Sequence, residues 1–179
     1  TTNAPVCSGD PLDLFGNTVA GATYSWVGPV TYTSTVQNPI ISPAAVSNSG
    51  VYTLTITVPG CTPSTGTVNV SVIPHDTANF TDVIHYGCTQ DTVVFTNTST
   101  NATSYTWDFG DGGTSTQQDP THIYTTQGNY NVKLTVNNGV CSDNITIPVN
   151  TLHPLVAAFT TDRDTLCKGQ TVTFTDAST

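Results

Sequence analysis

Short runs of alternating apolar and polar residues extend along the chain, and turn-forming residues separate them. Around Trp107, the rings of Tyr105, Trp107 and Phe109 alternate with Thr106 and Asp108. Because successive side chains of a β-strand point to opposite faces, this alternation places the three rings on one face of a strand. No segment sustains the 3.6-residue period of an amphipathic helix. The pattern therefore predicts an all-β protein whose strands each bury one face.

The pattern is repeated within the chain. Cys7 precedes Trp26 by 19 positions, and Cys88 precedes Trp107 by the same number (26 − 7 = 107 − 88 = 19). A third copy begins near Cys167, because the run 171–179 resembles the run 92–100. The repeat predicts three β-sandwich modules, which we call the first module (residues 1–73), the second module (residues 77–152) and the third module (residues 155–179). The third is expected to hold only its first strands, and the natural chain to continue past it.

Two short joints separate the predicted modules, at residues 73–76 and 152–154. Each contains a Pro, which fixes φ and removes a hydrogen-bond donor where the preceding strand should end. Joints this short restrict how neighbouring modules swing, so we expect an extended and fairly stiff array.

Three motifs follow one another in the second module: Trp-Asp-Phe-Gly-Asp-Gly at 107–112, Asp-Pro-Thr-His-Ile-Tyr at 119–124, and a strand that opens with Gly-Asn-Tyr at 128–136. On these motifs, residues 77–150 resemble a PKD domain. The resemblance implies an immunoglobulin-like β-sandwich of the kind found in extracellular and surface-displayed proteins. The first module has Gly28-Pro29 in place of the Asp-containing turn, so it resembles an immunoglobulin-like or PKD-like sandwich instead.

One Trp and one Tyr form the predicted core of each module: Trp26, Tyr52, Trp107 and Tyr130. The segment that ends at Tyr52 resembles the tyrosine corner of immunoglobulin domains, in which the Tyr hydroxyl bonds to backbone a few residues upstream. Tyr130 occupies the equivalent place in the second module. Leu54 and Val132 stand where the immunoglobulin disulfide would need a Cys, so that bridge is absent.

The cysteines predict one disulfide bond inside each module. Cys7 and Cys61 bracket the first module, and Cys88 and Cys141 bracket the second, with nearly equal spans (61 − 7 = 54 and 141 − 88 = 53). We therefore predict the pairs Cys7–Cys61 and Cys88–Cys141, each stabilising its module by about 4 kcal/mol in an oxidising compartment. Cys167 is left unpaired, its partner expected about 53 residues further on by the repeat; a free reactive or intermolecular thiol is the alternative.

The charge balance excludes two kinds of partner. The chain has 3 Lys and Arg against 12 Asp and Glu, for a formal charge of −9. A surface so poor in cations repels phosphate backbones and anionic headgroups, so we expect neither nucleic-acid binding nor binding to a membrane surface. No apolar run is long enough to cross a bilayer, so membrane insertion of this segment is not expected either.

Asp108, Asp111 and Asp119 lie on or near one turn of the second module, and clustered carboxylate oxygens suit calcium. The resemblance adds that some PKD domains bind calcium. The favoured alternative is that these carboxylates accept backbone N–H bonds and shape the hairpin. His122 falls in a segment where the resemblance implies a packed structural histidine. We predict no catalytic residue and no cofactor apart from this calcium candidate, because no nucleophile and base or paired carboxylates can be argued.

Three threonines, Thr77, Thr92 and Thr165, each follow an Asp and precede an aliphatic residue. This triplet resembles the O-glycosylation acceptor of some Gram-negative surface proteins. Because Thr is abundant in the chain, chance matches are the alternative.

Tandem modules, stiff joints and the missing catalytic residues favour a non-catalytic structural or adhesive repeat segment of a long secreted or cell-surface protein, one that could form filaments. Strings of such modules resemble large bacterial adhesins, so the expected partners are other copies of the chain, neighbouring repeats, and surface glycans or proteins. The alternative is an accessory carbohydrate- or protein-binding module of a secreted hydrolase. That function would call for an exposed aromatic platform, for which Tyr32 and Tyr86 are the remaining tyrosines.

Overall fold

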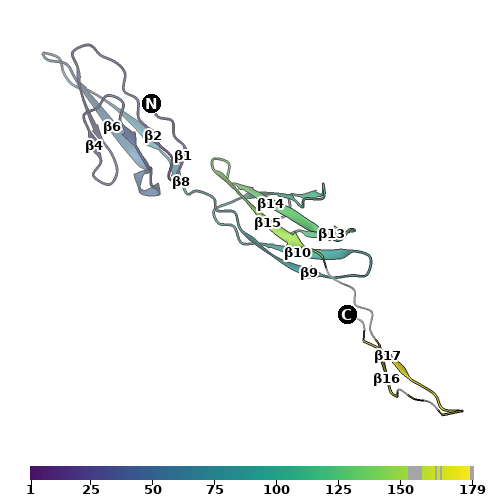
Figure 1. Cartoon of the computed structure of the whole chain (residues 1–179). Helices are drawn as coiled ribbons and strands as arrows, with labels where there is room; N and C mark the ends of the chain where they lie inside the picture. The colour runs from purple at the N-terminus through teal and green to yellow at the C-terminus, as the bar shows by residue number, and fades with distance from the viewer. Residues whose placement is uncertain (153–158, 164, 166, 178–179) are drawn as a thin grey trace.

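The computed structural model describes residues 1–152, 159–163, 165 and 167–177. These residues form β-strands, turns and loops, with one turn of 3₁₀ helix, η1 (Val46–Asn48). Figure 1 shows the strands gathered into successive groups along the chain. The predicted all-β class with immunoglobulin-like sandwiches is therefore confirmed. Residues 153–154, in the second predicted joint, lie outside the described residues.

Two layers of strands pack together in the first module. One layer is the four-stranded sheet β4-β3-β6-β7; the other holds the antiparallel pair β2-β5 and the parallel pair β1-β8. Trp26 of β3 lies opposite Leu54 of β6, and both side chains point between the layers toward Leu12 and Leu14. The strands are β1 (Val6–Cys7), β2 (Leu12–Asp13), β3 (Thr23–Val27), β4 (Thr33–Ser34), β5 (Ile40–Ile41), β6 (Gly50–Thr57), β7 (Ser64–Val70) and β8 (Val72–Ile73).

The second module repeats this plan with longer strands. One sheet has the order β13-β10-β9 and the other the order β12-β11-β14-β15. Trp107 is fully buried, and Phe80 and Phe95 of the opposite sheet contact it with ring centroids 5.0 and 5.3 Å away. The strands are β9 (Phe80–His85), β10 (Asp91–Asn97), β11 (Ser104–Asp108), β12 (Thr114–Ser115), β13 (Thr121–Tyr124), β14 (Asn129–Asn137) and β15 (Ser142–Asn150).

A two-stranded antiparallel pair, β16 (Phe159–Thr161) with β17 (Phe174–Asp176), follows the second module. Its register is that of β9 and β10: Phe159 pairs with Asp176 as Phe80 pairs with Asn97. The two Phe rings of this pair contact each other but remain about two-thirds exposed, at 66% and 67%. The strand pairing that the sequence repeat implies is therefore present, without a second sheet covering it in the described part of the chain.

Candidate functional site

A disulfide bond joins the first two modules. It links Cys7 to Cys141, whose Cα atoms are 5.7 Å apart and which are separated by 134 positions in the sequence. The predicted pairs Cys7–Cys61 and Cys88–Cys141 are therefore wrong. Cys61, Cys88 and Cys167 carry free thiols and are exposed.

The position of each cysteine along its module explains this pairing. Cys7 lies beside Ile73, the last residue of β8 and the first of the joint. Cys141 closes the turn between β14 and β15, which points toward β1 and β8 in Figure 1. Cys88 lies at the other end of the second module, where it lines a pocket together with Gln127, two residues before β14. The nine residues of β14 span about 30 Å. Since a disulfide bond needs Cα atoms within about 7 Å, the two cysteines of the second module cannot meet.

Polar side chains from both modules hold the joint at residues 73–76. The backbone N–H of His75 donates to the hydroxyl of Ser8 in the first module (3.0 Å), and its carbonyl accepts from the Nδ2 of Asn101 in the second (2.9 Å). The Nδ2 of Asn138 donates to the carbonyl of Pro74 (3.2 Å). The sequence did not predict the roles of Ser8, Asn101 and Asn138. Nothing in the local sequence around these residues indicates that their side chains contact the joint.

Two aspartates fix the start of the second module. Asp76 is 1% exposed, and its Oδ1 accepts a hydrogen bond from the Nδ2 of Asn138 (2.6 Å). The Oδ2 of Asp143 accepts a hydrogen bond from the backbone N–H of Ala78 (2.9 Å). That hydrogen bond is the main cause that lowers the pKa of Asp143. The joint is therefore held by one covalent bond and by hydrogen bonds on both of its sides.

The calcium candidates serve as backbone acceptors in this structure. Oδ1 of Asp108 accepts from the N–H of Gly110 (3.0 Å), and Oδ1 of Asp111 from the N–H of Gly113 (2.9 Å). Asp119 lies outside this turn, and its Oδ1 accepts from the backbone N–H of Asn97, the last residue of β10 (2.8 Å). Among the described residues, no group of three or more His, Cys, Asp or Glu side chains is placed to hold a metal ion. The geometry thus favours the hairpin-shaping interpretation of these carboxylates.

His122 has the packed position that the resemblance implied. Its ring stacks on Phe109 with centroids 4.1 Å apart, and its Nε2 lies 2.7 Å from Oδ2 of Asp111. Burial alone would raise the pKa of Asp111, but the hydrogen bonds from His122 and the Gly113 amide, with the charge of the imidazole, outweigh it and lower that pKa. This pair closes the turn after β11.

Both predicted tyrosine corners are present. The hydroxyl of Tyr52 donates to the carbonyl of Asn48 (3.0 Å), and that of Tyr130 to the carbonyl of Thr126 (2.5 Å). Trp26, Tyr52 and Trp107 are buried as predicted, whereas Tyr130 is only partly buried against the core.

Tyr124 takes the interior place that had been assigned to Tyr130. It is 1% exposed, donates to the carbonyl of Phe109 (2.9 Å) and stacks on Tyr130 with centroids 4.1 Å apart. Burial is the main cause that raises its pKa. The Pro-x-His-x-Tyr segment was the available signal for this residue.

The glycosylation candidates occupy different surroundings. Thr77 and Thr165 are exposed, whereas Thr92 is half-buried in β10 between β9 and β13. Their modification stays a prediction. The tyrosines proposed for an aromatic platform do not form one, because Tyr32 packs on the core residue Tyr52 with ring centroids 5.5 Å apart and Tyr86 lies in the other module.

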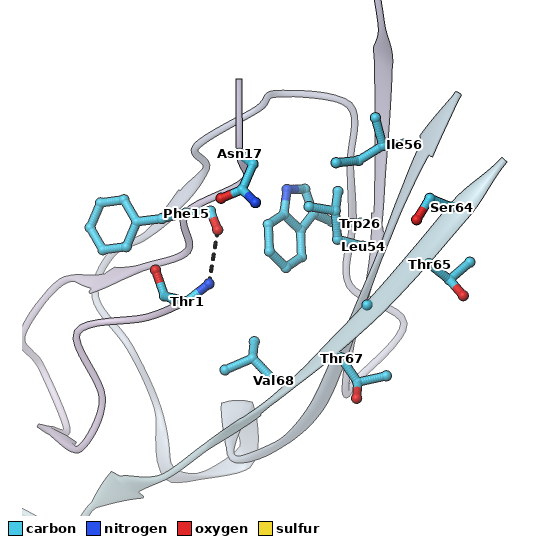
Figure 2. Close-up of a pocket in the computed structure, with 11 residues that line it drawn as sticks. Thr1, Phe15, Asn17, Trp26, Leu54, Ile56, Ser64, Thr65, Thr67 and Val68 are labelled. Atoms are coloured by element: carbon cyan, nitrogen blue, oxygen red, sulfur yellow. Dashed lines mark hydrogen bonds between the residues drawn. The ribbon is translucent and has the colours of Figure 1, made fainter. Parts of the chain in front are cut away.

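An open pocket of about 290 Å³ lies beside Trp26 in the first module. Figure 2 shows the indole at its centre, with Leu54 and Ile56 to its right, Thr1 and Phe15 to its left, and Val68 below it. The remaining lining residues are mostly Ser and Thr of β7, so the pocket offers neither a pair of carboxylates nor a nucleophile with its base.

The family comparison decides what the second module is. The family model described as a PKD domain matches residues 71–150. Residues 71–150 are a PKD domain. The structure of murine CEACAM1b aligns with this chain over 83% of this chain and 96% of CEACAM1b, at 14% identity and a TM-score of 0.51. This similarity supports the immunoglobulin-like fold alone.

Curated relatives of this chain are bacterial collagenases, where the sequence had suggested adhesins. Collagenase ColA of Bacillus cereus is 61% identical over 33 residues, which are 18% of this chain and 3% of that enzyme. Microbial collagenase of Vibrio alginolyticus is 41% identical over 63 residues, 35% of this chain and 7% of that enzyme. The chain thus spans a small part of these relatives. Among solved structures, the PKD1 domain of the Vibrio cholerae metalloprotease PrtV is 34% identical over 43% of this chain and 96% of that domain, with a TM-score of 0.39.

The described residues contain no helix that is long and apolar enough to span a membrane.

Proposed function

We propose that this chain is a non-catalytic accessory segment of a secreted hydrolase of the collagenase or metalloprotease kind, and that its modules set the distance and orientation of the domains beside them. The observation that carries the proposal is the identity between the chain and two bacterial collagenases, 61% over 33 residues and 41% over 63 residues. The proposal is also supported by the roles of the side chains described above, which pack in the cores, shape turns or hold the joint.

The bridged joint gives this accessory segment its mechanism. A linker without cross-links lets two domains sample many relative positions, whereas the Cys7–Cys141 bond and the hydrogen bonds around His75 hold one arrangement. Disulfide bonds persist in oxidising surroundings, which supports an extracellular location.

A second candidate function is a repeat segment of a long surface protein. The observation that favours it is the matching register of β16–β17 and β9–β10, since a third copy of the same strand pair is typical of an array. In that case the modules would space or join surface structures, with other copies or surface glycans and proteins as partners.

An immunoblot that uses an antibody against residues 1–152 would distinguish the two functions in cultures of the source cells. The accessory function predicts that the antigen is found in cell-free medium, and that tryptic peptides of the full-length band include a hydrolase domain. Antigen that stays with washed cells, in a band whose peptides come only from further immunoglobulin-like and PKD modules, would overturn it in favour of the surface repeat.

A further inference from the structure

Cys7 and Cys88 are equivalent residues of the two modules. Cys7 ends β1 where the first turn of its module begins, and Cys88 lies in the first turn of its module, between β9 and β10. Each is seven positions before a fully buried core residue, Leu14 in one case and Phe95 in the other (14 − 7 = 95 − 88 = 7). The first is bonded to the neighbouring module, and the second carries a free, exposed thiol.

Cys61 and Cys141 are equivalent in the same way. Leu54 of β6 and Leu134 of β14 each lie opposite the core Trp of their module. Each cysteine follows its Leu by seven positions, in the turn of a hairpin (61 − 54 = 141 − 134 = 7). Cys141 is bonded to the preceding module, whereas Cys61 is free and exposed.

The two free thiols lie at opposite outer ends of the two-module unit. β6 begins at Gly50, near the joint, and ends at Thr57, so the turn with Cys61 lies at the end of the first module away from the joint. Cys88 shares a pocket with Gln127, whose neighbour Gly128 is hydrogen-bonded through its backbone to Thr151. Cys88 therefore lies where the chain leaves the second module, as Cys7 lies where it leaves the first.

We propose that Cys88 and Cys61 are two further half-sites of the bond seen between Cys7 and Cys141. In this scheme the cysteine of the first turn in one module bonds to the hairpin cysteine of the module that follows it. Cys88 would bond to the hairpin cysteine of a module placed after the second, and Cys61 to the first-turn cysteine of a module placed before the first. Successive modules of an array would then be cross-linked in a staggered series.

Each new bond is an ordinary two-electron oxidation. Two S–H bonds break and one S–S bond forms, and the two protons and two electrons pass to a disulfide oxidant such as oxidised glutathione, which becomes two thiols. The exposed positions of Cys61 and Cys88 leave both sulfurs open to this exchange.

The test places residues 1–154 ahead of the full 179-residue chain, so that the first module of the following copy comes directly after the second module of the leading copy. This chain has nine cysteines, four from the leading copy and five from the following one. It is oxidised with a glutathione buffer, alkylated under native conditions, digested without reduction and mapped by mass spectrometry.

The expected map has Cys7–Cys141 in each copy and a bond between Cys88 of the leading copy and Cys61 of the following copy. Alkylation is then expected at three thiols instead of five. Cys88→Ser in the leading copy should restore alkylation of Cys61 in the following copy. The matched control is Cys167→Ser in the following copy, which should leave every bond in place. The proposal is overturned if Cys88 of the leading copy stays alkylatable while both Cys7–Cys141 bonds have formed, or if it is bonded to Cys141 of its own module.

Discussion

Removal of the bridge between the modules should destabilise the second module, although one of the two sulfurs belongs to the first. The change is Cys7→Ala together with Cys141→Ala. When the second module unfolds alone, Cys7 stays beside Ile73 in the folded first module. The bond to Cys141 then closes a loop of 68 residues in the unfolded module (141 − 73 = 68). In the chain-entropy description, a loop of this length corresponds to about 4 kcal/mol of lost unfolded-state freedom.

Trp fluorescence can follow each module separately, because the chain has two Trp residues and each is buried in its own core. In a Trp26→Phe background, Trp107 reports the second module alone. With a guanidinium dependence of about 2 kcal/mol per molar, loss of the bridge should lower the unfolding midpoint of this module by about 2 M.

The matched control is Cys61→Ala together with Cys88→Ala, which removes two exposed thiols and should change the midpoint very little. The reasoning is refuted if the control pair lowers the midpoint of the second module and the bridge pair does not. That result would mean that Cys88, and not Cys7, is the sulfur that stabilises this module.

Four further changes, one of them a control, test the cores and the turn. Tyr52→Phe removes a corner hydrogen bond and should lower the free energy of unfolding of the first module by about 1 kcal/mol in urea titrations. Phe80→Ala should lower that of the second module by about 3 to 5 kcal/mol, whereas Phe159→Ala, at an exposed ring, should change calorimetric melting very little. Because the pKa of Asp111 is lowered on folding, its contribution is complete above the ordinary carboxyl pKa of about 4 and is lost as pH falls through the lower, folded value. Melting temperature should therefore fall less steeply below pH 4 in Asp111→Asn than in the unchanged chain; equal slopes would contradict the assignment.

Features that depend on local pattern could be predicted from the sequence. Alternation around Trp107 predicted the strand and its buried face, and the resemblance of the segment around Tyr52 to a tyrosine corner predicted the hydrogen bond of its hydroxyl. These features arise within one strand or one turn, where side-chain direction and backbone geometry decide the contact.

Features that depend on which end of a module a residue occupies could not be predicted in the same way. The equal spans from Cys7 to Cys61 and from Cys88 to Cys141 fit a bond inside each module. They fit equally well a bond between equivalent positions of neighbouring modules. Only the lengths of β6 and β14 separate the two possibilities, because each strand carries its following hairpin cysteine to the far end. The burial of Tyr124 in place of Tyr130 could not be predicted either. The two rings stack on each other, and the sequence does not show which of them lies in the interior.

The bond between Cys7 and Cys141 also determines how the chain responds to mechanical tension. Residues 8–140 lie inside the loop that this bond closes. A pull on the two ends is therefore transmitted through the sulfur atoms, and residues 8–140, which hold both hydrophobic cores except Val149 of β15, are shielded from it. Reduction of the bond would place those residues under load, and an unravelled stretch of 134 residues could lengthen the chain by about 450 Å. The same segment would behave as an inextensible strut under oxidising conditions and as an extensible tether under reducing ones.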